Sequence, residues 1–150
     1  MILMIINSSS EEDTYRIGKK IGQSIYGGQI IELIGDVGSG KTALTKGIAE
    51  GLGIKNTVSS PSFAICCKYN TGNNLVLAHY DFYRLTDAGI MAEELSESIS
   101  RPDTITIIEW GEIVQDVLPA DRITIKITAP SENARIFDIS DNLELAEWFC

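Results

Sequence analysis

A glycine-rich segment has the residue types and spacing of a phosphate-binding loop. It fits the pattern G-x-x-x-x-G-K-[ST]. Glycines let the backbone adopt positive φ and turn its N–H groups inward, where they and a helix N-terminus cradle phosphates. The lysine supplies a point charge for the β- and γ-phosphates, and the final hydroxyl is a ligand for Mg²⁺. The segment predicts a site for ATP and Mg²⁺, formed by Gly35, Asp36, Val37, Gly38, Ser39, Gly40, Lys41 and Thr42.

Two acidic residues follow apolar segments further along the chain and could complete this site. Asp81 comes after residues 75–80, and Glu109 comes after residues 104–108. If both segments are strands parallel to the strand over 29–34, the acids lie where open α/β sheets bind their ligands. Asp81 would hold Mg²⁺ directly or through water, and Glu109 would join the metal shell or polarise the attacking water. The alternative for either acid is a cap or a solvated strand end.

The elements that must position these residues alternate between strand and helix. The loop stands between an apolar strand and a helix, a context that argues against a chance glycine-rich turn. This alternation predicts an α/β protein with the P-loop NTPase fold, in which helices flank a mixed β-sheet in one domain over residues 1–150. Strands are expected over 1–6, 29–34, 63–69, 75–80, 104–108, 122–128 and 134–139, and helices from about 10 to 24, from 42 to 52, over 91–99 and over 143–149.

Composition limits the class of protein. A chain of 150 residues, 44% of them hydrophobic, suits one domain with a real core. No apolar run approaches the roughly 20 residues that span a bilayer, and the first six residues lack the features of a signal peptide. The three cysteines have no metal-ligand spacing, which favours a reduced, cytoplasmic protein without membrane contact.

The net charge of −9 comes from 12 Lys and Arg against 21 Asp and Glu. Phosphate contacts need a basic face, so the chain is not expected to bind nucleic acid by itself. An acidic surface could instead bind a basic protein partner.

Three further motifs accompany the loop in a fixed order. They are Ser60–Phe63 (SPSF), His79–Leu85 (HYDFYRL) and Ile108–Glu112 (IEWGE). With the loop, they resemble the TsaE family, the ATPase component of bacterial tRNA threonylcarbamoyladenosine biosynthesis. The resemblance covers roughly residues 10–128. It implies a Mg²⁺-dependent ATPase that works with the TsaD–TsaB pair in N6-threonylcarbamoylation of adenosine 37 in tRNAs reading ANN codons, touches tRNA only through the complex, and turns over slowly alone.

The resemblance also implies roles for single residues around the metal. Ser62 stands where the family usually has a threonine in a switch-like loop, and its hydroxyl keeps a metal or γ-phosphate role possible. Asp81 and Glu109 match two acids of the family, and Glu109 is the one implicated in Mg²⁺ binding or catalysis. Together with Thr42, the two acids form the predicted metal set, and with Lys41 the predicted catalytic set.

Other matches lie around the nucleotide. Ser9 or Ser10 falls where the family contacts the base, and Arg135 falls where a late basic residue could reach the nucleotide. Trp110 matches a tryptophan that packs on the nucleotide, on a partner or in the core. His79 is expected to be a hydrogen-bonded structural residue rather than a base, and Tyr83 a core residue.

Two other functions remain open. One is a non-catalytic switch that binds ATP to control assembly, and the other is a small-molecule kinase. A kinase usually needs an arginine-bearing lid, whereas the five arginines here are scattered at positions 16, 84, 101, 122 and 135.

Overall fold

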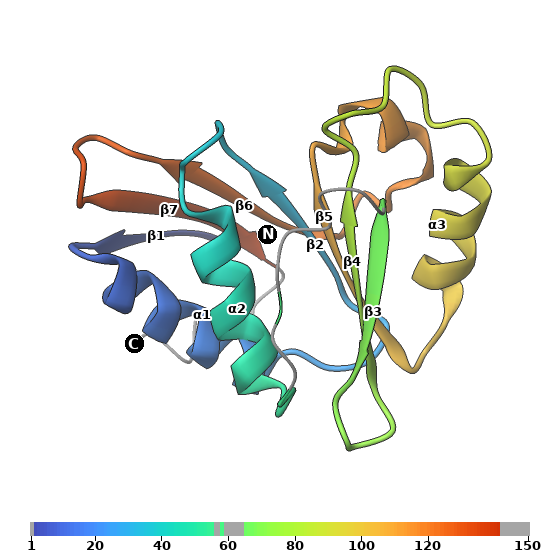
Figure 1. The fold of residues 1–150 in the computed structure, drawn as a ribbon, viewed down its shortest axis with the longest axis horizontal. Helices are drawn as coiled ribbons and strands as arrows, with labels where there is room; N and C mark the ends of the chain where they lie inside the picture. The colour runs from blue at the N-terminus through green and yellow to red at the C-terminus, as the bar shows by residue number, and fades with distance from the viewer. Residues whose placement is uncertain (1, 56–57, 59–64, 142–150) are drawn as a thin grey trace.

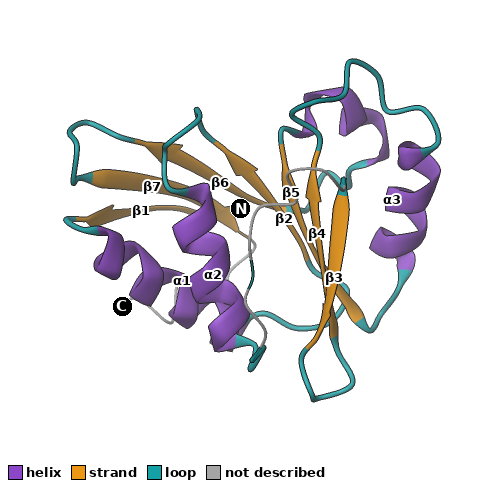
Figure 2. Cartoon of the chain, in the orientation of Figure 1, coloured by secondary structure: helices purple, strands orange, loops and turns teal. Residues whose placement is uncertain are grey.

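The computed structural model describes residues 2–55, 58 and 65–141. Within them a seven-stranded sheet carries helices on both faces, as Figures 1 and 2 show. The strands are β1 (Ile2–Ser8), β2 (Ile30–Ile34), β3 (Cys66–Asn70), β4 (Val76–Asp81), β5 (Thr104–Glu109), β6 (Ile123–Thr128) and β7 (Arg135–Asp141). The helices are α1 (Glu11–Ser24), α2 (Lys41–Gly51), α3 (Met91–Ser100) and the 3₁₀ helix η1 (Gly111–Val117).

The sheet is mixed, as predicted, and its order is β1-β7-β6-β2-β5-β4-β3. The central strands β6, β2, β5 and β4 are parallel, whereas β3 and β7 each run antiparallel to the neighbour inward of them. Asp81 at the end of β4 pairs with Glu109 at the end of β5, and Glu109 pairs with Leu33 of β2. The carboxyl ends of three parallel strands therefore meet at one edge, which confirms the arrangement on which the two acids depended.

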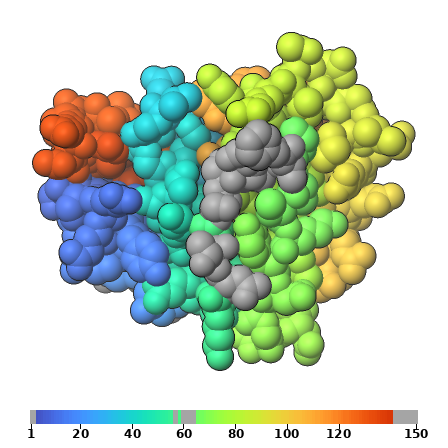
Figure 3. All heavy atoms as spheres, viewed as in Figure 1, coloured from blue at the N-terminus to red at the C-terminus, as the bar shows by residue number. Residues whose placement is uncertain are grey.

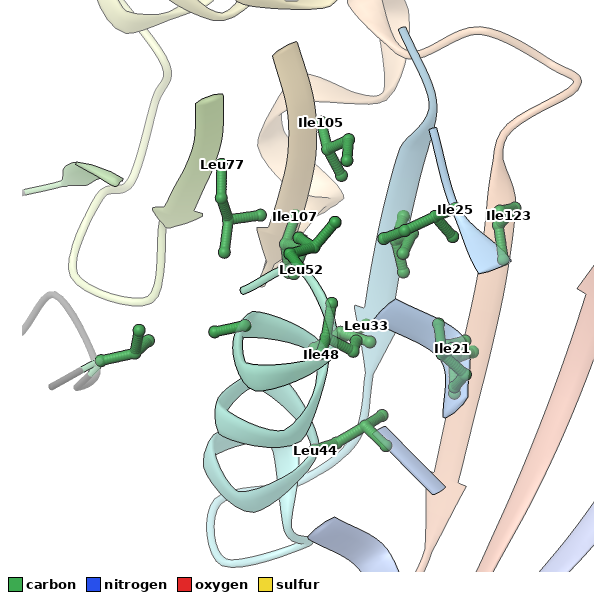
Figure 4. Packing of buried hydrophobic residues seen from close by; sticks show 14 of the residues in the cluster. Ile21, Ile25, Leu33, Leu44, Ile48, Leu52, Leu77, Ile105, Ile107 and Ile123 are labelled. Atoms are coloured by element: carbon green, nitrogen blue, oxygen red, sulfur yellow. The ribbon is translucent and has the colours of Figure 1, made fainter. Parts of the chain in front are cut away.

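Each face of the sheet buries its own apolar cluster. Strand β2 contributes to both, because successive side chains point to opposite faces. Leu33 packs with Ile48 of α2, and Ile30 belongs to the cluster under α3 and η1 with Leu95. Figure 4 shows Ile48 beside Leu33, with the other labelled core side chains around them. This packing fixes the start of α2 relative to the end of β2.

Helices α1 and α2 lie side by side with glycines at their contact (Figure 1). A Cβ placed on Gly47 would lie 2.2 Å from the carbonyl oxygen of Tyr15, and one on Gly22 would lie 2.2 Å from that of Ile48. Real Cβ atoms do not approach backbone this closely, so the contact requires residues without a side chain. The N-terminus of α1 is thereby held near the N-terminus of α2.

Most predicted elements are confirmed within a few residues, and one was missed. The 3₁₀ helix η1 was not predicted. Ser62, the rest of the Ser60–Phe63 motif and the predicted helix over 143–149 lie outside the described residues. In the described part of the chain, every helix is too short or too polar to cross a bilayer.

Candidate functional site

The loop between β2 and α2 is built on two left-handed glycines. Gly38 has φ of 79° and Gly40 has φ of 105°, a region that side chains other than glycine rarely occupy. The Ser39 N–H donates to the Asp36 carbonyl oxygen at 3.0 Å and closes the turn, and Gly40 caps α2. Figure 3 shows this cyan segment at the surface, between the orange-red β6–β7 hairpin and the yellow-green segment after β4.

Lys41 is folded back onto this loop. Its Nζ donates to the carbonyl oxygens of Gly35 at 2.5 Å and Asp36 at 2.9 Å, and it lies 4.6 Å from the ring centroid of Trp110. Only 7% of the residue is exposed. Burial lowers the pKa of Lys41, and the negative charges of Glu109 and other nearby acids oppose that shift. Lys41 therefore lies at the centre of the site, close to the carboxylates of Glu109 and Asp81.

The two strand-end acids line one cavity with the loop. The cavity has a volume of about 510 Å³, and its wall includes Lys41, Thr42, Asp81 and Glu109. The Asp81 carboxylate also accepts the Tyr83 N–H at 3.0 Å. All three residues of the predicted catalytic set therefore meet in the same space.

Glu109 is held by a buried histidine. The Nε2 of His79 lies 2.5 Å from Oε2 of Glu109, and the two side chains are 1% and 4% exposed. Nδ1 of His79 is buried and has no hydrogen-bond partner among the described residues, so within them the contact with Glu109 orients the ring. His79 is therefore hydrogen-bonded, as expected from the sequence, and its partner is the carboxylate of Glu109.

Trp110 forms a wall of the cavity in a strained conformation. Its φ and ψ are 57° and 48°, a left-handed geometry that costs a non-glycine residue about 1 kcal/mol or more. Its ring packs against Tyr83, with centroids 4.8 Å apart. Tyr83 is 58% exposed, so the prediction that it is a core residue is wrong: it covers the outer side of Trp110 at the rim of the cavity.

The far end of the cavity lies between α1 and the β6–β7 hairpin. Ser10 is the N-cap of α1 and accepts the Asp13 N–H at 3.0 Å. It lines the cavity, as does Arg135 at the start of β7. Four polar lining residues at this end were missed, because single polar residues in a helix turn and a hairpin carry no recognisable signal in sequence: Glu11, Thr14, Glu132 and Asn133.

The predicted nucleotide residues that the structure describes, a set without Ser62, divide into two groups. Gly35, Asp36 and Ser39 shape the loop through the contacts described for Lys41 and Ser39, and do not line the cavity. The others line it directly: Ser10, Val37, Gly38, Gly40, Lys41, Thr42, Trp110 and Arg135.

The oxygen donors of the cavity suit Mg²⁺ delivered with a nucleotide. The described residues contain no group of three or more His, Cys, Asp or Glu side chains that could enclose a metal. Thr42, Asp81 and Glu109 offer one hydroxyl and two carboxylates on the same wall. Mg²⁺ commonly binds through one or two carboxylates together with phosphates and water, so this donor set fits the ion.

A buried polar network anchors the segment that follows Trp110. Glu32 of β2 is 3% exposed and accepts hydrogen bonds from Arg122 Nε and Gln115 Nε2, both at 2.8 Å. Gln115 Nε2 also donates to the Gly111 carbonyl oxygen at 2.9 Å. The network thus fastens η1 to the central strand immediately beyond Glu109 and Trp110.

Replacing Arg122 with methionine should destabilise the protein by about 3 kcal/mol, because it leaves the buried Glu32 carboxylate without its cation. Urea denaturation followed by circular dichroism would measure this. The matched control is Arg101→Met, whose arginine forms an exposed pair with Asp103 and should change the unfolding midpoint little. Equal midpoints for the two variants would show that the network does not stabilise the fold.

Comparisons with known proteins show which family the chain matches. Residues 8–137 match the family model described as "Threonylcarbamoyl adenosine biosynthesis protein TsaE". The chain is 37% identical over 125 residues to a Bacillus subtilis protein named tRNA threonylcarbamoyladenosine biosynthesis protein TsaE, with 83% of this chain and 77% of that protein covered. A protein of the same name from Streptomyces coelicolor is 35% identical over 112 residues, and the match covers 74% of this chain and 76% of that protein.

A solved structure supports the fold. The crystal structure of Bacillus subtilis YdiB superposes with a TM-score of 0.76 at 29% identity and covers 99% of this chain and 92% of that one. This supports the P-loop NTPase fold predicted from the order of the elements. The loop, the strand-end acids, the family model and the curated relatives lead to one conclusion: this chain belongs to the TsaE family of threonylcarbamoyladenosine biosynthesis proteins.

Proposed function

We propose that this chain is a cytoplasmic, Mg²⁺-dependent ATPase subunit, one nucleotide-binding domain, that supports N6-threonylcarbamoylation of adenosine 37 in tRNAs reading ANN codons. The observation that carries the proposal is the meeting of Lys41, Asp81 and Glu109 on one cavity beside a helix N-terminus. A cation, helix N–H groups and two carboxylates together are what phosphoryl transfer to water requires.

The residues of the cavity would have separate roles in ATP hydrolysis. The loop N–H groups and Lys41 bind the phosphates and stabilise the charge that develops on the γ-phosphoryl oxygens. Glu109, held by His79, accepts a hydrogen bond from a water molecule and orients it for in-line attack. Mg²⁺, when bound near Thr42, Asp81 and Glu109, would neutralise charge on the β- and γ-phosphates.

The charge of the chain and the names of its relatives support the proposed protein partners. A net charge of −9 suits docking on a basic protein better than on tRNA. The relatives are named as tRNA threonylcarbamoyladenosine biosynthesis proteins, a pathway in which the TsaD–TsaB pair would bind the tRNA. The chain would therefore reach tRNA through these partners.

The test is ATP hydrolysis by the purified chain, alone and with a TsaD–TsaB pair plus tRNA. We expect slow turnover alone and a rise of about tenfold or more with the pair, because small P-loop proteins often need a partner to complete catalysis. Lys41→Ala is the control for contaminating ATPase and should abolish both rates. Turnover that the pair does not change would leave an ATPase that acts elsewhere.

A further inference from the structure

Arg135 contacts the back of the phosphate loop. Its Nε donates to the Ser39 carbonyl oxygen at 2.8 Å, and its Nη2 lies 3.4 Å from that of Gly38. Arg135 is 96 positions from Ser39 and 97 positions from Gly38 in the sequence. Its hydrogen bonds therefore connect the start of β7 to the phosphate loop. A Cβ on Gly40 would lie 3.6 Å from Nε of Arg135, which places the guanidinium against the loop.

The remaining nitrogen of the guanidinium fastens the hairpin from which it comes. Nη1 of Arg135 donates to the carbonyl oxygens of Ser131 and Glu132, both at 3.0 Å, and of Ala134 at 2.7 Å. All three nitrogens thus contact backbone carbonyls. A planar group with a fixed fork of donors can bridge two segments in this way, whereas an ammonium on a flexible stem cannot.

The contact with Ser39 has a consequence for the neighbouring N–H group. The peptide bond between Ser39 and Gly40 is planar and trans, so its carbonyl and its N–H point in opposite directions. A carbonyl held on Arg135 therefore directs the Gly40 N–H away from the guanidinium. Gly40 lines the cavity and caps α2, where free N–H groups bind anions.

We propose that Arg135 is a positioning residue that presets the phosphate loop in the nucleotide-free protein by holding the Ser39 and Gly38 carbonyls. It does so from the side of the cavity formed by the β6–β7 hairpin, and it ties the loop to that hairpin. The inference rests on the proposed function for its ligand, a polyphosphate, but the preset loop belongs to the protein alone.

The experiment compares Arg135→Gln, Arg135→Lys and the control Arg101→Gln in ¹⁵N-labelled, nucleotide-free protein. We expect the Gly40 amide signal to shift in both Arg135 variants, because lysine does not reproduce the bridge. The control should leave it unchanged. Pyrophosphate affinity should fall about tenfold in both Arg135 variants, again with no change in the control.

A measurement on the wild-type protein guards against variants that fail to fold. The Nε–H signal of Arg135 should be protected from exchange without ligand and should keep its position when pyrophosphate is added. An unprotected Nε–H signal, or one that moves with pyrophosphate, would overturn the proposal in favour of direct phosphate contact. So would an affinity that Arg135→Lys restores, or a Gly40 amide unchanged in both variants. Failure of the wild type to bind pyrophosphate or ATP would refute the proposed function, while the ligand-free signals would still decide the role of Arg135.

Discussion

We expect Glu109→Gln to lower the rate of ATP hydrolysis by about 10²-fold to 10³-fold while ATP binding is retained. Glutamine keeps the size of the side chain and a polar contact for His79, but it lacks the charge that polarises the attacking water. Single-turnover hydrolysis and the quenching of tryptophan fluorescence by ATP would separate the two effects. Trp110 lies 4.6 Å from Lys41 and is therefore placed to report on binding.

Glu93→Gln is the matched control, since Glu93 is an exposed acid on α3 outside the cavity wall. It should leave turnover near the wild-type rate. If Glu109→Gln weakens Mg²⁺-dependent binding as much as it slows hydrolysis, Glu109 is chiefly a metal ligand. If it changes neither, Glu109 has no catalytic role. A wild-type chain that binds ATP without measurable turnover would instead be a non-catalytic ATP-binding switch.

Gly47→Ala should destabilise the fold by about 3 kcal/mol, although alanine is intrinsically the better helix former. The new Cβ would lie 2.2 Å from the Tyr15 carbonyl oxygen and 3.0 Å from Cα of Gly18, so α1 and α2 must move apart. The contact to be relieved is with backbone, which cannot rotate away as a side-chain end can. Thermal and urea denaturation would measure the loss.

The control is Lys46→Ala on the exposed side of the same helix. Helix propensity changes little between these residues, so its stability should match the wild type. A Gly47→Ala variant as stable as this control would show that the two helices separate without cost. A destabilised variant that also binds ATP weakly would show that helix spacing affects the site.

How much could be read from sequence depends on how local each feature is. The phosphate loop is contiguous and fixed by its glycines, and the strands of Asp81 and Glu109 are apolar runs that end at the acids. Both were therefore predictable. The partner of Glu109 was not, because His79 lies 30 positions away and meets it only through strand register.

Two further features were hidden for other reasons. Trp110 adopts a left-handed backbone conformation that its residue type disfavours. The helix η1 is held by the hydrogen-bond network through Glu32, and its sequence has no periodic pattern that predicts a helix. Tyr83 was misassigned because aromatic residues beside a buried strand usually pack inward. Here the chain turns at Asp81, and the ring packs on Trp110 at the cavity rim instead.

For the proposed nucleotide ligand, binding of phosphate to Lys41 would compete with the hydrogen bonds that the lysine already makes. Lys41 already satisfies its ammonium with the carbonyls of Gly35 and Asp36, so a phosphate must displace these two acceptors before the lysine contributes. Its contribution is then a difference between two bonded states, and it vanishes for a ligand that has no phosphate. Adenosine would leave the lysine where it is. The two resting hydrogen bonds of Lys41 would thus reduce the preference for polyphosphates over nucleosides that an unbonded lysine would give.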